Sequence, residues 1–119
     1  MAATPSSGLL QSGQWYDFAR VQFVPRDPGV YFFRAQNAPN VYIGKADRLR
    51  DRLQDHLRCI EIIQELSATK ATWEFRFITS GNPSALEYVA LKGYANKVNR
   101  RETGEQAFRE VERLAHAKG

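Results

Sequence analysis

A stripe of apolar side chains at helical spacing runs through the middle of this 119-residue chain. Its members recur at steps of three and four residues: Leu49, Leu53, Leu57, Ile60, Ile63 and Leu66. This period predicts an amphipathic helical stretch, either one helix or two with a break near Cys59. Because strand-like runs lie both before and after the stretch, we expect the apolar stripe to pack against a sheet.

Three segments have the composition of β-strands. Residues 30–34 are β-branched and aromatic and follow the turn pair Pro28-Gly29, and residues 41–43 are expected to close a hairpin with them. Residues 71–79 alternate between aromatic and polar side chains, which is typical of a half-buried strand. The pattern therefore predicts two strands before the long helix and one after it.

Two further helices are expected after the last strand. Asn82-Pro83 supplies a capping residue and a proline at the first helical position, and residues 103–106 have capping-box spacing. Because the helices are grouped after the hairpin, we predict an α+β fold with a small three-stranded, mainly antiparallel sheet flanked by helices. Residues 15–119 are expected to form a single domain, and the Gly- and Ser-rich residues 1–14 a flexible tail.

Charge and cysteine content indicate the kind of partner and the cellular location to expect. Lys and Arg total 17 against 13 Asp and Glu, and twelve of the cations are Arg, which favours an anionic partner. Cys59 is the only cysteine, so no intramolecular disulfide can form and a cytoplasmic location is expected. No apolar run is long enough to span a membrane, and the first residues do not have the pattern of a signal peptide, so we expect no membrane partner.

Several common kinds of site do not fit the sequence. Gly44-Lys45 lacks the preceding glycine of a phosphate-binding loop and is followed by Ala46. His56 and Cys59 share a helix face, but His116 is the only other soft ligand, and structural zinc takes four ligands. No cluster of carboxylates follows a strand, which argues against a two-metal hydrolase.

A more specific constellation connects the hairpin to the helices. Tyr31 and Tyr42 lie eleven residues apart on strands that the hairpin brings together. Arg52 and His56 are one turn apart on one face of the long helix, and Arg48 precedes them by another turn. Two polar residues complete the set: Glu87 on the next helix and, twelve residues later, Asn99.

This pattern resembles the GIY-YIG endonuclease superfamily, including the N-terminal incision domain of the bacterial nucleotide-excision-repair nuclease. The resemblance extends from about Val24 to Asn99, with the first signature written GVY at residues 29–31 and the second, YIG, intact at residues 42–44. It implies a DNA endonuclease, active in DNA repair in that branch of the superfamily, that leaves 5′-phosphate and 3′-hydroxyl ends.

The resemblance also implies a role for each matching position. The residues that match catalytic positions are Tyr31, Tyr42, Arg52, His56 and Glu87, the last of which matches the metal-binding glutamate. Three residues expected to bind substrate also match the family motif: the signature glycine Gly44, the following Lys45 and the motif-closing Asn99. Arg48, Lys97 and Arg100 are expected to bind substrate because their positive charges could contact the phosphate backbone. One divalent ion, Mg²⁺ or Mn²⁺, is expected to bind through Glu87.

The chemistry of phosphodiester hydrolysis is consistent with these residue types. Mg²⁺ needs only one or two carboxylates, so Glu87 could hold the ion alone, and the guanidinium of Arg52 suits the non-bridging phosphate oxygens. Tyr31 is a candidate general base if Lys45 and Arg52 lower its pKa from the ordinary value of about 10. His56 is the alternative base.

The expected partner is DNA, either duplex or branched. A single catalytic site cuts one strand, so duplex cleavage would need a homodimer or sequential nicking, and a targeting partner protein is also compatible with the sequence. Two alternatives stay open: a non-catalytic nucleic-acid-binding module of the same fold, and a structure-specific or RNA-directed nuclease.

Overall fold

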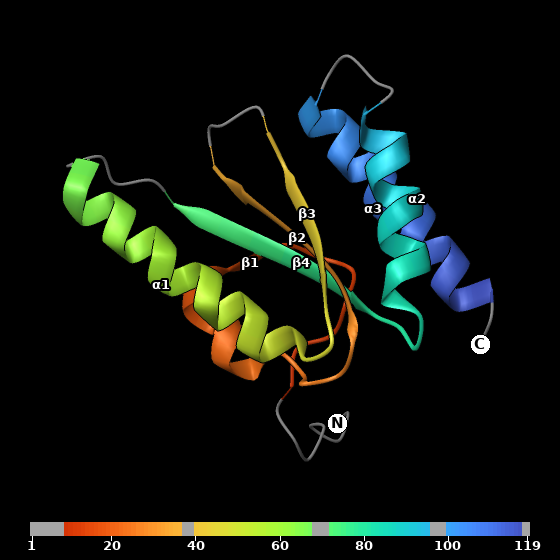
Figure 1. The fold of residues 1–119 in the computed structure, drawn as a ribbon, viewed down its shortest axis with the longest axis horizontal. Helices are drawn as coiled ribbons and strands as arrows, with labels where there is room; N and C mark the ends of the chain where they lie inside the picture. Colours follow the sequence, from red (N-terminus) through yellow and green to blue (C-terminus); the bar gives the residue numbers. More distant parts are fainter. Residues whose placement is uncertain (1–8, 37–39, 68–71, 96–99, 118–119) are drawn as a thin grey trace, which may run out of the picture.

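The computed structural model describes residues 9–36, 40–67, 72–95 and 100–117, and within these ranges one antiparallel sheet has the strand order β1-β4-β2-β3 (Figure 1). The strands are β1 (Tyr16–Asp17), β2 (Gly29–Ala35), β3 (Tyr42–Ala46) and β4 (Trp73–Thr79). The predicted α+β class and antiparallel sheet are confirmed, but the predicted number of three strands is wrong. β1 was not predicted because a two-residue strand is too short to show any periodicity, and it exists only through pairing with β4.

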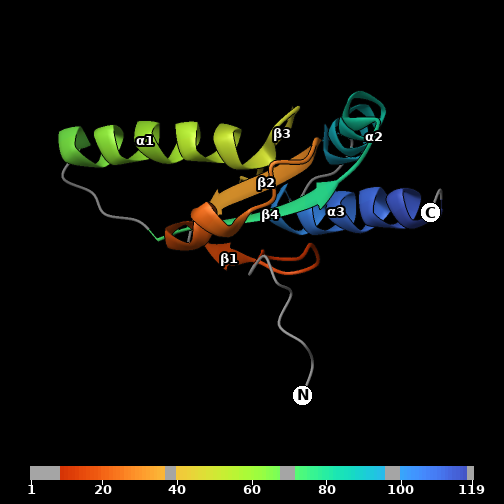
Figure 2. The same ribbon diagram turned by 90° about the horizontal axis from the view of Figure 1, so that it is seen from below.

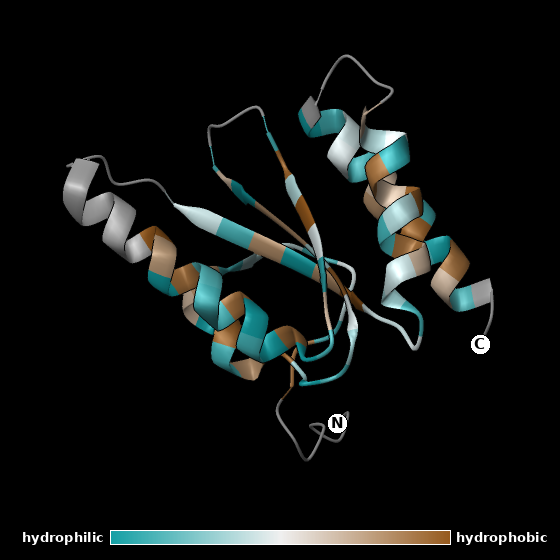
Figure 3. Ribbon diagram, in the orientation of Figure 1, coloured by the Kyte–Doolittle hydropathy of each residue, from teal (hydrophilic) through white to brown (hydrophobic). Residues whose placement is uncertain are grey.

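Helices cover both faces of the sheet (Figure 2). One face packs against α1 (Leu49–Ser67) and the short 3₁₀ helix η1 (Phe18–Phe23). The other face packs against α2 (Pro83–Ala95) and α3 (Arg100–Ala117). The central helical stretch is a single helix, and Figure 3 shows hydrophilic and hydrophobic residues alternating along its described part.

Strand β2 contributes side chains to two cores, one on each face of the sheet. Tyr31 and Phe33 point toward α1, and Val30 and Phe32 point toward α2 and α3. Because both faces are covered, residues 29–33 are all buried, which explains their continuous apolar character. The predicted hairpin is confirmed, and its register places Tyr31 opposite Gly44 and Phe33 opposite Tyr42.

The two C-terminal helices differ in how well their starts were predicted. α2 begins at Pro83 as expected, and the side-chain oxygen of Asn82 accepts a hydrogen bond from the Ala85 amide at 3.4 Å. The start expected from the capping-box spacing at residues 103–106 is wrong, because α3 already includes Arg100. Gly104 lies inside α3, where a Cβ atom would come within 2.7 Å of Val41, so the glycine permits close packing of the helix on the sheet.

Residues from the predicted tail contact this domain. The Leu10 amide donates to the Phe23 carbonyl at 2.8 Å, and the Leu10 side chain packs against the core on the α1 side of the sheet. The Gly13 carbonyl accepts a hydrogen bond from Arg76 at 3.0 Å. Within the described ranges, no helix combines the length and the apolar character that crossing a bilayer would require.

A buried ion-pair network attaches α3 to the sheet on the face opposite α1. Arg76 is only 9% exposed, and its guanidinium donates to the carboxylate of Glu105, which also accepts from Arg34 at 3.0 Å and from the Trp15 indole. Burial by itself would raise the pKa of Glu105, but the Trp15 hydrogen bond and the charges of Arg76 and Arg34 outweigh it and lower that pKa. The network therefore stabilises the fold only while Glu105 is ionised.

Glu105→Gln is expected to lower the free energy of unfolding by about 2–3 kcal/mol at pH 7, because it leaves the buried Arg76 without a counter-charge. Since the pKa of Glu105 is lowered on folding, this stabilisation is complete above the unfolded-state pKa of about 4.3 and is lost as the pH falls through the folded-state value. Urea unfolding of wild type and variant at pH 7 and at acidic pH checks this. A difference that stayed constant on acidification would contradict an electrostatic role.

Candidate active site

Tyr31 and His56 form the centre of the predicted constellation. The Tyr31 side chain comes from the middle of β2, is 1% exposed, and its hydroxyl lies 2.8 Å from Nε2 of His56 on α1. Across the hairpin, Gly44 lies directly opposite Tyr31, and a Cβ atom there would come within 2.4 Å of the hydroxyl oxygen. Gly44 was expected to bind substrate; in the structure it is buried beneath Tyr31 and leaves room for that ring.

The electrostatic environment of Tyr31 differs from the expectation. Burial raises the pKa of Tyr31, and its interaction with Arg52 only partly opposes that rise, while the nearby Tyr42 and Glu87 add to it. Arg52 lowers this pKa as expected, but desolvation outweighs the cation, so the net direction is opposite to the expected one. Lys45 instead donates to the hydroxyl of Ser84 on α2 at 2.8 Å. Tyr31 thus keeps its proton at neutral pH.

The pKa of His56 is shifted in the opposite direction to that of Tyr31. The ring is partly buried, and this burial together with the charge of Arg52 lowers the pKa of His56 below 6.5, against a smaller opposing effect of Asp55. The imidazole is therefore neutral at pH 7, and its Nε2 can accept the hydrogen bond that the Tyr31 hydroxyl donates. A hydrogen bond in this direction allows a proton to move from the tyrosine to the histidine.

An aromatic wall surrounds this pair. The Tyr42 ring is 50% exposed, and its centroid lies 4.7 Å from that of Phe33 and 5.4 Å from that of His56. The sequence analysis did not assign Phe33 to the site, although its place two residues after Tyr31 puts both rings on one face of β2. Both rings pack against the imidazole, and Tyr42 is the exposed member of this group.

A charged groove opens between the start of α1 and the start of α2. It has a volume of about 460 Å³, and its lining includes Lys45, Arg48 and Arg52 on the cationic side. Acidic side chains also line it, and one of them, Asp51, pairs with Arg48 at 3.2 Å. Arg52 is exposed and lies beside Tyr31, and the interaction with that hydroxyl raises the pKa of the guanidinium. The groove therefore places the positively charged guanidinium of Arg52 next to the hydrogen-bonded pair of Tyr31 and His56.

Glu87 reaches the same region from α2. Its side chain is partly buried and lies close enough to Tyr31 to raise the pKa of the tyrosine. Among the described residues, no three His, Cys, Asp or Glu side chains are grouped so that they could hold a metal ion together. A lone carboxylate fits Mg²⁺ or Mn²⁺, because Mg²⁺ commonly binds through one or two carboxylates and retains several waters. It does not fit a structural zinc site.

Some predicted residues cannot be placed in this site. Lys97 and Asn99 lie outside the described residues. Arg100 is the first residue of α3, and its side chain is not among those described. The sequence analysis missed Ser84, which lines the groove and accepts the Lys45 hydrogen bond; its position in the first turn of α2 was the only available signal.

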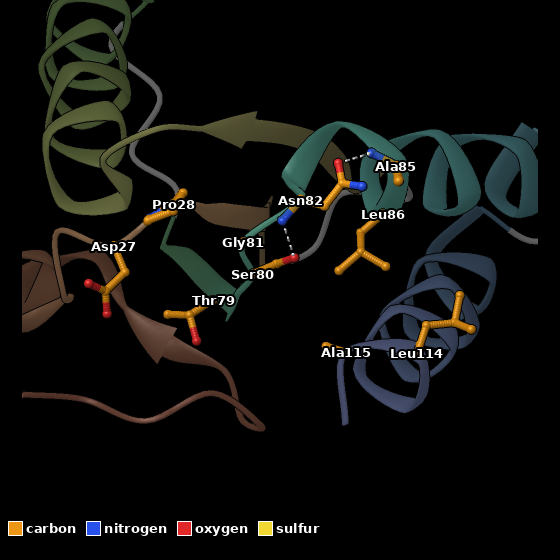
Figure 4. Close-up of a pocket in the computed structure, with 10 residues that line it drawn as sticks. All are labelled: Asp27, Pro28, Thr79, Ser80, Gly81, Asn82, Ala85, Leu86, Leu114 and Ala115. Carbon is orange, nitrogen blue, oxygen red and sulfur yellow. Dashed lines mark hydrogen bonds between the residues drawn. The ribbon is translucent and has the colours of Figure 1, made fainter. Parts of the chain in front are cut away.

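A larger cavity lies elsewhere and takes no part in this constellation (Figure 4). Its volume is about 660 Å³, and it lies between the β4–α2 connection and the C-terminal part of α3. Its wall includes Asn82, which accepts from the Ala85 amide of α2, and Ser80, whose hydroxyl accepts from the Asn82 amide. Asp27 is the only ionisable residue in its lining. None of the predicted site residues lines this cavity, whereas Lys45, Arg48 and Arg52 line the charged groove.

Comparison with a family model and comparison with curated proteins both give matches to one family. A family model described as the UvrC-like GIY-YIG domain matches residues 27–100. The chain is similar to proteins named UvrABC system protein C: 46% identical over 85 residues to that of Microcystis aeruginosa, covering 67% of this chain and 14% of the relative. The similarity to that of Corynebacterium aurimucosum is 33% over 81 residues (64% and 12%), and to that of Thermobifida fusca 30% over 90 residues (71% and 14%). The chain therefore spans a small part of these relatives, and no solved structure matches it significantly.

Proposed function

The chain belongs to the GIY-YIG nuclease family, in its UvrC-like branch, and on this basis we propose that it is a metal-dependent DNA endonuclease. The proposed reaction is hydrolysis of a phosphodiester bond to 5′-phosphate and 3′-hydroxyl ends. The observation that carries the proposal is the hydrogen bond between Tyr31 and a neutral His56, with Arg52 beside the tyrosine hydroxyl.

In the proposed mechanism, Tyr31 and His56 together act as the base. The attacking water gives a proton to the Tyr31 oxygen while the tyrosine's own proton moves to Nε2 of His56, so no free tyrosinate is needed. The water oxygen forms the new bond to phosphorus and the bond to the 3′ oxygen breaks. The departing oxygen takes a proton from solvent to become the 3′-hydroxyl, and His56 releases its proton to solvent. Arg52 donates to the non-bridging oxygens, whose charge increases in the transition state.

Glu87 is the proposed ligand of the divalent ion. Glu87 is the only carboxylate of α2, and Mg²⁺ commonly binds through one or two carboxylates, so this side chain suits Mg²⁺ or Mn²⁺. When bound, such an ion would act as a Lewis acid on the scissile phosphate and on the departing 3′ oxygen.

We further propose that the groove binds DNA through its phosphates. Lys45, Arg48 and Arg52 are exposed there, and the chain has a net charge of +4. One site cuts one strand, so a homodimer or sequential nicking would be needed to cut a duplex. Because the relatives are named as component C of a UvrABC system, we favour partner proteins and a role in DNA repair.

The direct test is incubation of the purified protein with supercoiled plasmid in Mg²⁺, in Mn²⁺ or in EDTA. We expect nicked circles with either ion and none in EDTA, and ligation of the products by DNA ligase would verify the 5′-phosphate ends. Salt-sensitive binding to DNA without cleavage of any DNA or RNA substrate would instead support a non-catalytic binding module.

Arg52→Lys is expected to lower the single-turnover nicking rate by about 10²–10³-fold, because lysine keeps the charge but not the forked pair of donors. Affinity for DNA in EDTA is expected to change little. Arg58→Lys, at another exposed arginine of α1, is the matched control and should nick at the wild-type rate. If Arg52→Lys bound DNA more weakly but turned over normally at saturation, Arg52 would be a phosphate contact only.

A further inference from the structure

Helix α2 exposes apolar side chains on the face that it turns away from the core. Leu86 and Ala90 are buried, whereas Tyr88 and Leu91 are 65% and 43% exposed. Four residues at spacings of three and four share the outer face, here called the α2 stripe: Ser84, Glu87, Tyr88 and Leu91. The stripe therefore combines a residue of the charged groove, the proposed metal ligand and a large exposed aromatic ring.

The α2 stripe runs alongside the edge strand of the candidate active site. Lys45 of β3 donates to Ser84 near the start of α2, and the amide of Val41 donates to the Tyr94 hydroxyl near its end at 3.0 Å. These two contacts hold the helix along β3, as Figure 1 shows. Tyr88 lies one turn beyond Ser84, about 6 Å along the helix axis, and follows Glu87 directly in the chain.

The charges around Tyr88 suit a nucleic-acid strand better than an apolar protein surface. The ammonium group of Lys92, one turn further along α2, lies 5.9 Å from the centroid of the Tyr88 ring. The groove at the other end of the stripe contributes the cations of Lys45, Arg48 and Arg52. Its lining also includes Asp47, Asp51 and Asp55, of which Asp51 pairs with Arg48. An exposed aromatic ring between cationic groups is the arrangement with which proteins bind single-stranded nucleic acid, since bases stack on the ring and phosphates pair with the cations.

We propose that Tyr88 is a base-stacking residue that binds an unpaired nucleobase of the substrate strand next to the cleavage site. This inference rests on the proposed function in one respect, namely that the groove binds the phosphates of DNA. Because a single helical turn separates Ser84 of the groove from Tyr88, the stacked base lies close to the phosphate bound in the groove. The base must be unpaired, because the base faces inside a duplex are covered by their neighbours. Tyr88 thereby gives the site a preference for DNA that is locally unwound.

Binding in EDTA to two DNAs of the same length tests this, one fully paired and one with a short unpaired stretch that carries 2-aminopurine. We expect wild type to prefer the partly unpaired DNA and to quench the 2-aminopurine fluorescence. Tyr88→Ala is expected to lose about 5- to 150-fold in affinity for that DNA, the range for one stacked base, with its affinity for the duplex unchanged. Tyr88→Phe should retain the preference because it keeps the ring. The matched control Phe23→Ala removes another exposed aromatic, on η1, and should behave as wild type.

The inference would be overturned if Tyr88→Ala bound both DNAs as wild type does, or if it weakened binding to both equally. Unchanged DNA binding together with reduced self-association of Tyr88→Ala would also overturn it and identify the α2 stripe as a protein-binding face. Nicking assays on the same preparations separate this inference from the proposed function. If wild type nicks plasmid but Tyr88→Ala does not change DNA binding, only the stacking role is disproved. If Tyr88 stacks on the base but the protein never nicks DNA, only the nuclease role is disproved.

Discussion

Glu87→Gln is expected to reduce Mg²⁺-dependent nicking by about 10³-fold or more, because a divalent ion acting as a Lewis acid contributes several kcal/mol to transition-state stabilisation. The variant keeps the shape of the side chain and removes the charge that would hold the ion. Since α2 offers no other carboxylate, raising the Mg²⁺ concentration should restore the rate only in part. The measurement is the single-turnover nicking rate as a function of Mg²⁺ concentration.

Two controls separate an ion-binding role of Glu87 from a structural one. Thermal melting and DNA binding in EDTA should be close to those of wild type, since neither depends on the ion. Glu110→Gln removes an exposed carboxylate of α3 that pairs with Arg113, and it should leave nicking unchanged. Full activity of Glu87→Gln would disprove the metal assignment, and a large fall in melting temperature would make Glu87 a structural residue.

Tyr31→Phe is expected to lower the nicking rate by about 10²–10⁴-fold, the usual contribution of general acid–base catalysis. The ring remains in the core, so the free energy of unfolding should fall by only about 1 kcal/mol, for the hydrogen bond to His56. Binding of uncleaved DNA should not change. Rates equal to wild type would exclude Tyr31 from the proton transfer and leave His56 as the base.

The pH dependence of the rate distinguishes a neutral tyrosine–histidine pair from a tyrosinate. The active form needs a neutral His56, whose pKa is lowered by burial and by Arg52, so the wild-type rate should rise with pH only in the acidic range below 6.5. It should then be level from neutral to mildly alkaline pH, because burial raises the pKa of Tyr31 and no tyrosinate forms there. A rate that kept climbing through the alkaline range would show that tyrosinate is the base.

The order and type of the main elements could be predicted from the sequence because their signals are local. The apolar stripe from Leu49 onward, the hairpin residues and the Asn82-Pro83 start all depend on spacing within a few residues. Tyr31 on the hairpin and His56 on the helix were predicted to belong to one site, but the hydrogen bond between them was not predicted. β1 could not be predicted from the sequence, because a two-residue strand has no period of its own. It depends on pairing with β4, which is almost 60 residues away in the chain.

The chemistry of Tyr31 was decided by tertiary structure alone. By sequence, the cations at Lys45 and Arg52 indicated a tyrosine with a lowered pKa. In the fold, Lys45 turns to Ser84, and the surrounding core desolvates the Tyr31 ring more strongly than Arg52 can offset. The same packing explains Gly44, whose missing side chain gives the buried ring its space. Residue spacing indicated which side chains belong to the site. The direction of the pKa shifts of Tyr31 and His56 depends on burial, which results from many contacts between residues far apart in the chain.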